Sequence, residues 1–289
     1  MLPTTATSFG FSGPTELGDT TTSAQGDPVS RQVVVSDFQD QVSLNRLAWV
    51  RERRTTALIS PANPGDDIWP GGGIYPWLSA AEPLIIAPGG DANDSVAGTG
   101  AQQIRILGVD ADFNEIEELV DTNGSSASAP TIQSFLRVNY VELTRVGTVR
   151  GLEAGIIVIV GASTFTPLSV VIEGASRNGI YTVPRGRTLV VDKLSAEADS
   201  PNATIYRRGA VASLNRALNN VDMLAGQYGP RSVETLLVMA NKVGIEYVNE
   251  RPWRFPERTD VWLRVVSEEL QGNPVQMVIN WSLRQYKNQ

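Results

Sequence analysis

The pattern that most restricts the fold is a strict alternation of side chains near the end of the chain. Five apolar residues occupy every second position of this stretch: Val275, Met277, Ile279, Trp281 and Leu283. Successive side chains of a β-strand point to opposite faces, so this spacing predicts a strand with one face in a core.

Shorter stretches of β-type sequence recur through the chain, and Gly, Asn, Asp and Pro residues separate them. In one of them, Leu136, Val138 and Tyr140 alternate with Arg137 and Asn139. Predicted strands lie at 33–35, 104–106, 116–120, 136–140, 156–160, 168–172, 180–183, 189–191, 233–239, 245–248 and 261–266. Only the segment from Arg207 to Gln227 has apolar residues at helical spacing, which predicts a single helix there.

These patterns predict an all-β fold with two β-sandwich or jelly-roll-like domains, at residues 56–175 and 176–289. Residues 1–55 are expected to hold an extended N-terminal arm and a first strand. The first 30 residues are rich in Thr, Ser, Gly and Pro, and such a segment cannot bury enough apolar surface to fold alone. It is either a disordered tail or an arm that becomes ordered on a neighbouring subunit, with Phe9, Phe11 and Leu17 as anchors.

A short charged run, residues 51–54, precedes a Pro-rich linker at residues 61–65. Such a run is usually a solvated face. Its position before the linker also suits a hinge between arm and body, and makes Arg51, Arg53 and Arg54 candidate interface residues.

The composition excludes many kinds of catalysis, because the 289 residues contain no His and no Cys. Hydrolases with a Ser-His-Asp triad, thiol catalysis, disulfides and Cys- or His-ligated zinc are therefore ruled out. Carboxylate-based glycoside hydrolysis and magnesium-dependent phosphoryl transfer stay open. We predict a protein that is not an enzyme and that has no cofactor and no metal.

The formal net charge of −7 argues against a nucleic-acid partner, because binding phosphates requires concentrated positive charge. No apolar stretch approaches the ~20 residues of a membrane-spanning helix, so we expect no membrane partner. The first residues also lack the basic-then-apolar pattern of a secretory signal.

Three short motifs suggest ligand binding but have simpler structural interpretations. Residues 110–121 place carboxylates at calcium-loop spacing, yet Glu115 stands where that loop needs glycine, which favours a β-hairpin. Residues 98–100 (Gly-Thr-Gly) precede a strand where a phosphate-binding loop needs a helix, which favours a tight turn. Glu117 and Glu118 are neighbours on a predicted strand and point to opposite faces, so they cannot flank one glycosidic bond.

Three aromatic residues, Trp69, Tyr75 and Trp77, lie close together in a Gly- and Pro-rich loop. They could form a platform on which a host glycan stacks. The favoured alternative is packing at the end of a sandwich or in a subunit contact, where aromatic residues are enriched.

An ordered series of motifs gives the sequence a resemblance to a known family. The pieces are Ile68–Trp77, Asn93–Ala101, Ile104–Glu115, Phe135–Asn139, Tyr181–Thr188 and Phe255–Val261. In this order they resemble the "IW..GG.YPW", "NDT.AGTGA", "GLDAN.NE", "F.RVN", "YTVPAGKT" and "P..TDI" elements of a family of virion-associated proteins of tailed bacteriophages, frequent in short-tailed phages and cyanophages. The resemblance covers about residues 66–266, and Arg185 departs from the usual Ala of the fifth element.

The resemblance implies a structural protein of the virion, with no catalytic residues to carry over. We therefore expect a component of the tail, neck or fibre attachment region. It would form a trimer or ring and dock to a portal, adaptor, tail or major capsid protein. A capsid decoration (cement) protein is the alternative within this class, and a host-glycan-binding module is the alternative outside it.

Overall fold

The structure is a computed structural model that describes residues 20–22, 28–30, 50–60, 63, 65–148, 152–199, 210–218, 235–239, 245–268 and 276–288. The chain divides into two compact units, Met1–Leu47 and Ala48–Gln289. In the first unit, β1 (Thr20–Thr22) pairs antiparallel with β2 (Pro28–Ser30). The predicted anchors Phe9, Phe11 and Leu17 and the strand predicted at 33–35 lie outside the described residues.

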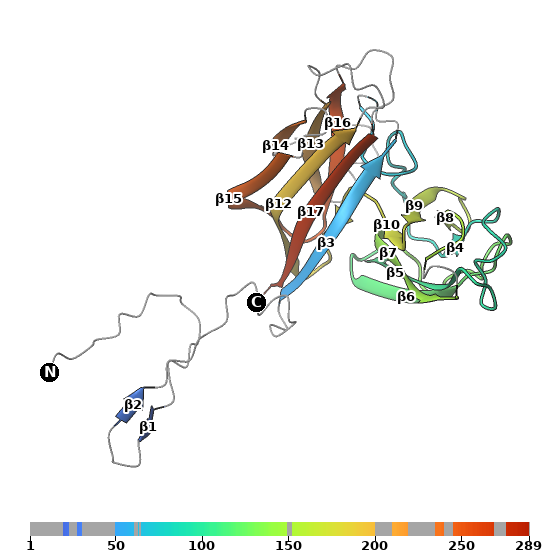
Figure 1. Ribbon diagram of the computed structural model, residues 1–289, viewed down its shortest axis with the longest axis horizontal. Helices are drawn as coiled ribbons and strands as arrows, with labels where there is room; N and C mark the ends of the chain where they lie inside the picture. Colours follow the sequence, from blue (N-terminus) through green and yellow to red (C-terminus); the bar gives the residue numbers. More distant parts are fainter. Residues whose placement is uncertain are drawn as a thin grey trace. The chain divides into compact units, whose positions relative to one another are not determined.

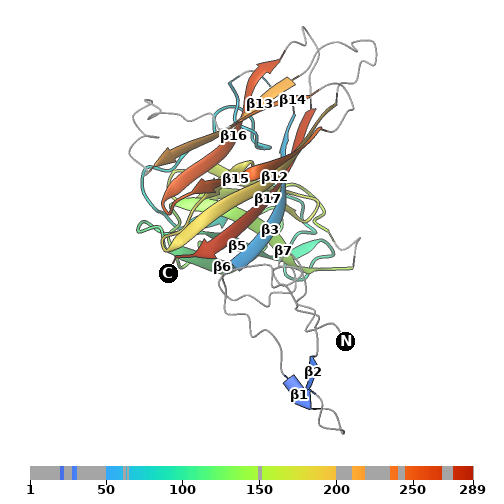
Figure 2. The ribbon, with the colours of Figure 1, turned by 90° about the vertical axis from the view of Figure 1, so that its left-hand side faces the viewer.

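Eight strands of the second unit form two four-stranded sheets. One sheet contains β3 (Val50–Ile59), β12 (Arg187–Asp199), β15 (Ile245–Phe255) and β17 (Gln276–Lys287), in the order β15-β12-β17-β3. The other contains β11 (Ile180–Thr182), β13 (Ala210–Leu218), β14 (Thr235–Met239) and β16 (Thr259–Glu268), in the order β11-β16-β13-β14. Figures 1 and 2 show β12, β17 and β3 side by side in the first sheet.

The pairing of these eight strands is that of a jelly roll. Along the chain, the first strand pairs with the last (β3 with β17), the second with the seventh (β11 with β16), the third with the sixth (β12 with β15) and the fourth with the fifth (β13 with β14). An antiparallel ribbon wrapped in this way gives the two facing sheets of a double Greek key. We refer to residues 48–65 and 180–289, within which these eight strands lie, as the jelly roll.

The two sheets enclose one apolar core to which both contribute alternate residues. The alternation predicted near the C-terminus is confirmed over the described residues, because Met277, Ile279, Trp281 and Leu283 are at most 2% exposed. Burying side chains of this size stabilises a fold by roughly 1.5–3 kcal/mol each.

A second body is inserted between β3 and β11, and we call residues 66–179 the insert. It is one seven-stranded sheet, with the order β4-β8-β9-β10-β7-β5-β6. Its strands are β4 (Leu84–Ile86), β5 (Ala101–Val109), β6 (Glu115–Asp121), β7 (Arg137–Val146), β8 (Ile157–Gly161), β9 (Pro167–Ile172) and β10 (Ala175–Ser176). The sheet is curled around a core of its own; the sequence predicted a β-sandwich or jelly-roll-like domain for this part of the chain.

One loop, residues 122–136, covers the β4 edge of this sheet. The backbone N–H groups of Ser128 and Thr131 donate to the carbonyl oxygens of Ile86 and Leu84. In return, the N–H groups of Ile86 and Leu84 donate to Ser128 Oγ (2.9 Å) and Thr131 Oγ1 (2.8 Å). The backbone groups that an edge strand normally exposes are therefore paired within the chain.

The same loop also reaches β6, the other edge of the sheet. Glu118 accepts the N–H groups of Ile132 (2.7 Å) and Gln133 (2.9 Å), and Gln133 Nε2 donates to Glu117 O (2.7 Å). One loop thus connects the two edge strands, so the insert gains some of the protection from edge-to-edge pairing that a closed barrel would have.

The predicted all-β fold is confirmed: none of the described residues lies in a helix, and every described strand pairs antiparallel. The hairpin interpretation of residues 110–121 is confirmed as well. Its turn is held by Asp110 Oδ1, which accepts the N–H groups of Asp112 and Asn114 at 2.9 Å. Residues 98–100 form a turn directly before β5, as predicted.

The helix predicted between Arg207 and Gln227 is wrong where the structure describes that segment. Residues 210–218 form β13, which pairs with β14 on one side and β16 on the other. Pairing with two neighbouring strands satisfies the backbone of β13 and overrides the helical spacing of its apolar residues.

The charged run at residues 51–54 lies inside β3, which pairs along its length with β17. This strand crosses the domain boundary that the sequence suggested between residues 55 and 56. The first strand of the jelly roll, β3, therefore precedes the insert in the sequence, and the other seven strands follow the insert from β11 onward.

Candidate functional site

The predicted aromatic loop packs into the molecule. Trp69 and Tyr75 are 2% and 1% exposed, and Trp77 is half-buried. Tyr75 stands edge-to-face between the two indoles, with ring centroids 5.3 Å from Trp69 and 4.9 Å from Trp77. Gly71 is required here, because a Cβ at this position would lie 2.1 Å from Trp69 Cη2.

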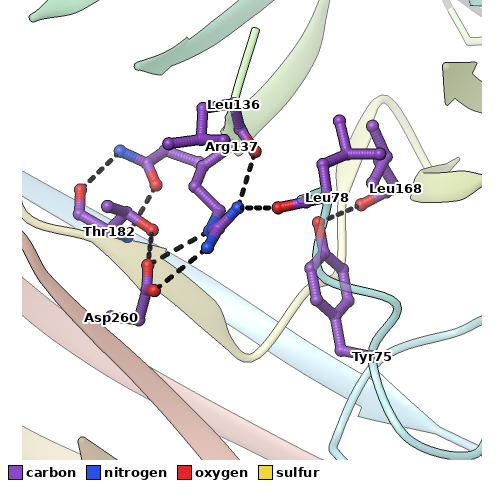
Figure 3. Close-up of polar contacts among 8 residues, drawn as sticks. Tyr75, Leu78, Leu136, Arg137, Leu168, Thr182 and Asp260 are labelled. Atoms are coloured by element: carbon purple, nitrogen blue, oxygen red, sulfur yellow. Dashed lines mark hydrogen bonds and ion pairs between the residues drawn. The ribbon is translucent and has the colours of Figure 1, made fainter. Parts of the chain in front are cut away.

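The Tyr75 hydroxyl donates to Leu168 O at 2.9 Å inside the insert (Figure 3). Burial raises the pKa of this phenol above its ordinary value, so it stays protonated as a donor. Trp69 and Tyr75 therefore offer no surface to a glycan or a protein partner, and the structure corrects their assignment as interface residues. Of the three, Trp77 alone keeps an accessible part.

Arg51 is the charged-run residue whose side chain the structure describes. It is exposed, and its Nη1 lies 3.0 Å from Glu115 Oε2, at the start of β6. Arg53 and Arg54 belong to β3, where their backbones pair with Leu283 and Ser282. Their side chains lie outside the described residues.

Strand β16 lies between the two bodies, and over residues 259–265 both of its faces are buried. Val261, Leu263 and Val265 point into the jelly-roll core. Asp260, Trp262 and Arg264 alternate with them, and Trp262 belongs to the core of the insert. The three outward residues each have a partner in the insert, which makes this face of β16 the central site of the molecule.

The first partner is Arg137 of β7, which forms a buried ion pair with Asp260 (Figure 3). Arg137 Nε and Nη2 each lie 3.3 Å from an Asp260 oxygen, and the two side chains are 2% and 0% exposed. Arg137 Nη1 also donates to the carbonyl oxygens of Leu78 and Leu136, both at 2.9 Å. The guanidinium is thus hydrogen-bonded on several sides, as a buried charge requires.

Neighbouring polar groups extend this ion pair across the junction. Thr182 of β11 donates its hydroxyl to Asp260 Oδ1. The Thr182 backbone exchanges two hydrogen bonds with the Asn139 amide of β7, at 2.7 and 2.8 Å. Gly108 of β5 makes room for this arrangement, because a Cβ there would lie 2.0 Å from Arg137 O. The network fixes β7 of the insert to β11 and β16 of the jelly roll.

The second ion pair joins Arg264 of β16 to Asp67, near the start of the insert. Arg264 Nε donates to Asp67 Oδ1 at 2.7 Å, and the Tyr75 N–H donates to Asp67 Oδ2 at 2.9 Å. Burial raises the pKa of the Asp67 carboxyl above its ordinary value, although the Arg264 guanidinium works in the opposite direction.

Aromatic rings fill the space between the two ion pairs. Trp77 of the insert meets Trp262 of β16 edge-to-face at 6.0 Å. The Arg137 guanidinium lies 4.9 Å from the Trp77 ring centroid, and that of Arg264 lies 5.9 Å from Trp262. Cation–π contacts of this kind contribute roughly 0.5–2 kcal/mol. The junction is therefore a continuous series of charges and rings.

Two further buried carboxylates hold loops of the insert together. Asp94 accepts the N–H groups of Ala101 (2.7 Å), Ala154 (2.8 Å) and Gly155 (2.9 Å). Glu82 accepts the Ser163 N–H at 2.8 Å, together with the Thr164 N–H and hydroxyl.

Burial alone would raise the pKa of Glu82, but its three hydrogen bonds outweigh burial and lower that pKa below its ordinary value. Both Asp94 and Glu82 therefore act as structural carboxylates that stabilise loops.

The sequence patterns missed these charged residues. One signal was present: Arg137 interrupts an apolar stretch, and Asp260 and Arg264 flank Trp262 on one strand face. Among the described residues, no group of three or more Asp and Glu residues is placed to hold a metal ion. The same residues include no helix long and apolar enough to cross a membrane.

Comparisons with known proteins give little further information. No family model and no curated protein matches the chain. A structure of the Gt strain of infectious bursal disease virus aligns with 87% of this chain and 82% of its own, at 11% identity and a TM-score of 0.14. The VP2 subviral particle of the same virus aligns with 82% of this chain and 76% of its own, at 8% identity and a TM-score of 0.14. Scores this low support no inference about fold or function.

Proposed function

We propose that this chain is a non-enzymatic structural subunit of a virus particle, which associates with copies of itself and with other virion proteins. The observation that carries the proposal is the jelly roll whose first connection is expanded into a second β body, fixed in place by the outward face of β16. Jelly rolls are common in capsid proteins and also occur in lectins and cupins. The fold therefore supports the proposed function only by analogy. The choice between a capsid-type subunit, a lectin and a cupin depends on the individual residues.

The contacts of the buried carboxylates favour a structural subunit over an enzyme. Asp67, Glu82, Asp94 and Asp260 are all buried, and each binds groups of the same chain. A catalytic carboxylate must instead reach a substrate. The lectin alternative loses support because Trp69 and Tyr75, two rings of its predicted glycan platform, are buried.

The motif series in the sequence supports the more specific proposal of a tailed-phage protein at the tail, neck or fibre attachment region. A capsid decoration protein is the alternative, since such a protein would also be a rigid subunit without catalytic residues.

Mass spectrometry of purified particles of the virus that encodes this chain tests both levels. We expect the chain in intact particles at a fixed ratio to the major capsid protein, and its loss from heads stripped of their tails. Retention on tail-less heads at high copy number would select the decoration protein. Absence from intact particles would contradict the proposed function.

A further inference from the structure

Charge is divided unevenly between the two bodies of this chain. The insert has 5 Lys and Arg residues against 14 Asp and Glu residues, a net charge of −9. The jelly roll has 17 Lys and Arg residues against 12 Asp and Glu residues, a net charge of +5. Together with the −3 of residues 1–47, these charges make up the overall −7, in which an acidic body is joined to a basic one.

Six cationic residues of the jelly roll lie at one of its ends. At this end Arg187 of β12 lies opposite Lys287 of β17 in the strand register. The Asn288 N–H donates to Gly186 O at 2.9 Å. The cationic residues on the strand ends and loops here, which we call the basic end, are Arg51, Arg185, Arg187, Arg254, Arg258 and Lys287. Arg254 points to the outer face of the sheet, because its neighbours Trp253 and Phe255 belong to the core. Four of them, Arg51, Arg185, Arg254 and Lys287, are exposed.

An acidic strip of the insert lies directly beside the basic end. It consists of Asp110, Asp112, Glu115 and Glu117, on the β5–β6 turn and the start of edge strand β6. The Arg185 N–H donates to the carbonyl oxygen of the turn residue Phe113 at 2.7 Å. Asp112, Glu115 and Glu117 are exposed.

Contacts within the chain neutralise only part of this charge. Glu115 Oε2 lies 3.0 Å from Arg51 Nη1 and 3.7 Å from Arg187 Nη2. Within the described residues, Arg187 Nη1 and Arg258 Nε have no hydrogen-bond acceptor. Asp112 and Arg254 are both exposed and therefore accessible to an outside partner.

We infer that copies of this chain bind one another through these two charged surfaces, with the acidic strip of one copy against the basic end of the next. The inference rests on the proposed function, because it specifies the surfaces through which a self-associating subunit would bind its copies. A second copy fits because it supplies both signs of charge in adjacent positions, which gives complementary contacts and a fixed register. A nucleic acid fits less well, since the acidic strip would repel its phosphates.

Charge reversal tests this inference with exposed residues only. The basic-end variant carries Arg254→Glu and Lys287→Glu, and the acidic-strip variant carries Asp112→Lys and Glu117→Lys. A matched control carries Asp121→Lys and Glu173→Lys, which make the same charge change at exposed insert positions away from the strip. Self-association is measured by sedimentation equilibrium at low and high salt, with circular dichroism to verify folding.

The wild type is expected to self-associate at low salt and to weaken as salt screens the exposed charges. Each reversal variant should bind itself at least about tenfold more weakly, while the control behaves as the wild type. An equimolar mixture of the two reversal variants should associate again. The basic-end variant then presents two acidic surfaces and the acidic-strip variant two basic ones, so the two variants are complementary to each other.

Three results would overturn the inference. They are a monomeric wild type at low salt, a control that weakens as much as the reversal variants, and a mixture that stays monomeric. Binding of duplex DNA through the basic end without self-association would also overturn it, in favour of nucleic acid. The inference can fail in these ways while the chain is still found in particles, so its failure is distinguishable from failure of the proposed function.

Discussion

At the scale of single residues, the buried charges of this molecule hold separate parts of the chain together. The Arg137–Asp260 pair illustrates why such charges survive inside a protein: several hydrogen bonds surround it, from Thr182 and to two backbone carbonyls. Removing one member leaves the other charge buried without its counter-ion, which is costly. Replacing both members with apolar side chains removes that problem.

We predict that Asp260→Asn lowers the free energy of unfolding by about 3–5 kcal/mol, because it leaves the Arg137 guanidinium buried and uncompensated. The double variant Arg137→Met, Asp260→Leu is expected to be less destabilised than this single variant. Urea unfolding followed by circular dichroism measures both.

The control for this pair is Arg51→Ala, which removes an ion pair whose arginine side chain is 57% exposed. A surface pair of this kind contributes about 0–1 kcal/mol. If Asp260→Asn costs no more than Arg51→Ala, the Arg137–Asp260 pair does not stabilise the junction as argued.

At the scale of secondary-structure elements, the sequence predicts strands best where burial is one-sided. Strand β17 faces one core, so its buried residues fall at every second position and the pattern is visible. Strand β16 is buried on both faces, and no alternation shows that Asp260, Trp262 and Arg264 face a second body. Their partners come from residues far away in the chain.

Two other misses have the same physical origin. The spacing of Val211, Leu214 and Leu218 fits a helix, but strands β14 and β16 on either side decide the conformation of this segment. The short strand β4 escaped prediction because a loop about 40 residues further along the chain supplies its second set of hydrogen bonds. The aromatic loop was located correctly, yet only the tertiary structure shows that its rings point inward.

The loop of residues 122–136 leads to a prediction about the β4 edge. Ser128→Ala and Thr131→Val remove the acceptors of the Ile86 and Leu84 N–H groups, and each is expected to cost about 1–3 kcal/mol. The Leu84 and Ile86 amides should then exchange hydrogen faster, and the uncovered edge should promote aggregation. Hydrogen-exchange mass spectrometry and light scattering measure these effects.

The matched control for the loop is Ser126→Ala, an exposed serine of the same loop. Its removal should leave exchange at β4 unchanged. Unchanged exchange in the Ser128 and Thr131 variants as well would show that the loop does not protect this edge.

At the scale of the whole second unit, the insert and the jelly roll share a junction, and separating them at this junction would destabilise both. Trp262 and Ile180 come from the jelly-roll sheet and yet belong to the core of the insert. If the insert unfolded alone, two ion pairs and these two side chains would be exposed to water.

We therefore predict that the two bodies unfold in one cooperative transition. Hydrogen exchange in increasing urea should show that strands of both bodies lose protection at the same denaturant concentration. Loss of protection in β4–β10 at a clearly lower concentration than in β12 and β17 would contradict this prediction.

The double burial of β16 also restricts how such a chain can be rebuilt. An insert taken from another protein would meet Asp260, Trp262 and Arg264 without bringing Arg137, Trp77 and Asp67. Its graft would leave two charges and an indole facing unmatched surfaces. A working chimera must therefore exchange the β16 face together with the insert, as one module composed of two segments that are far apart in the sequence.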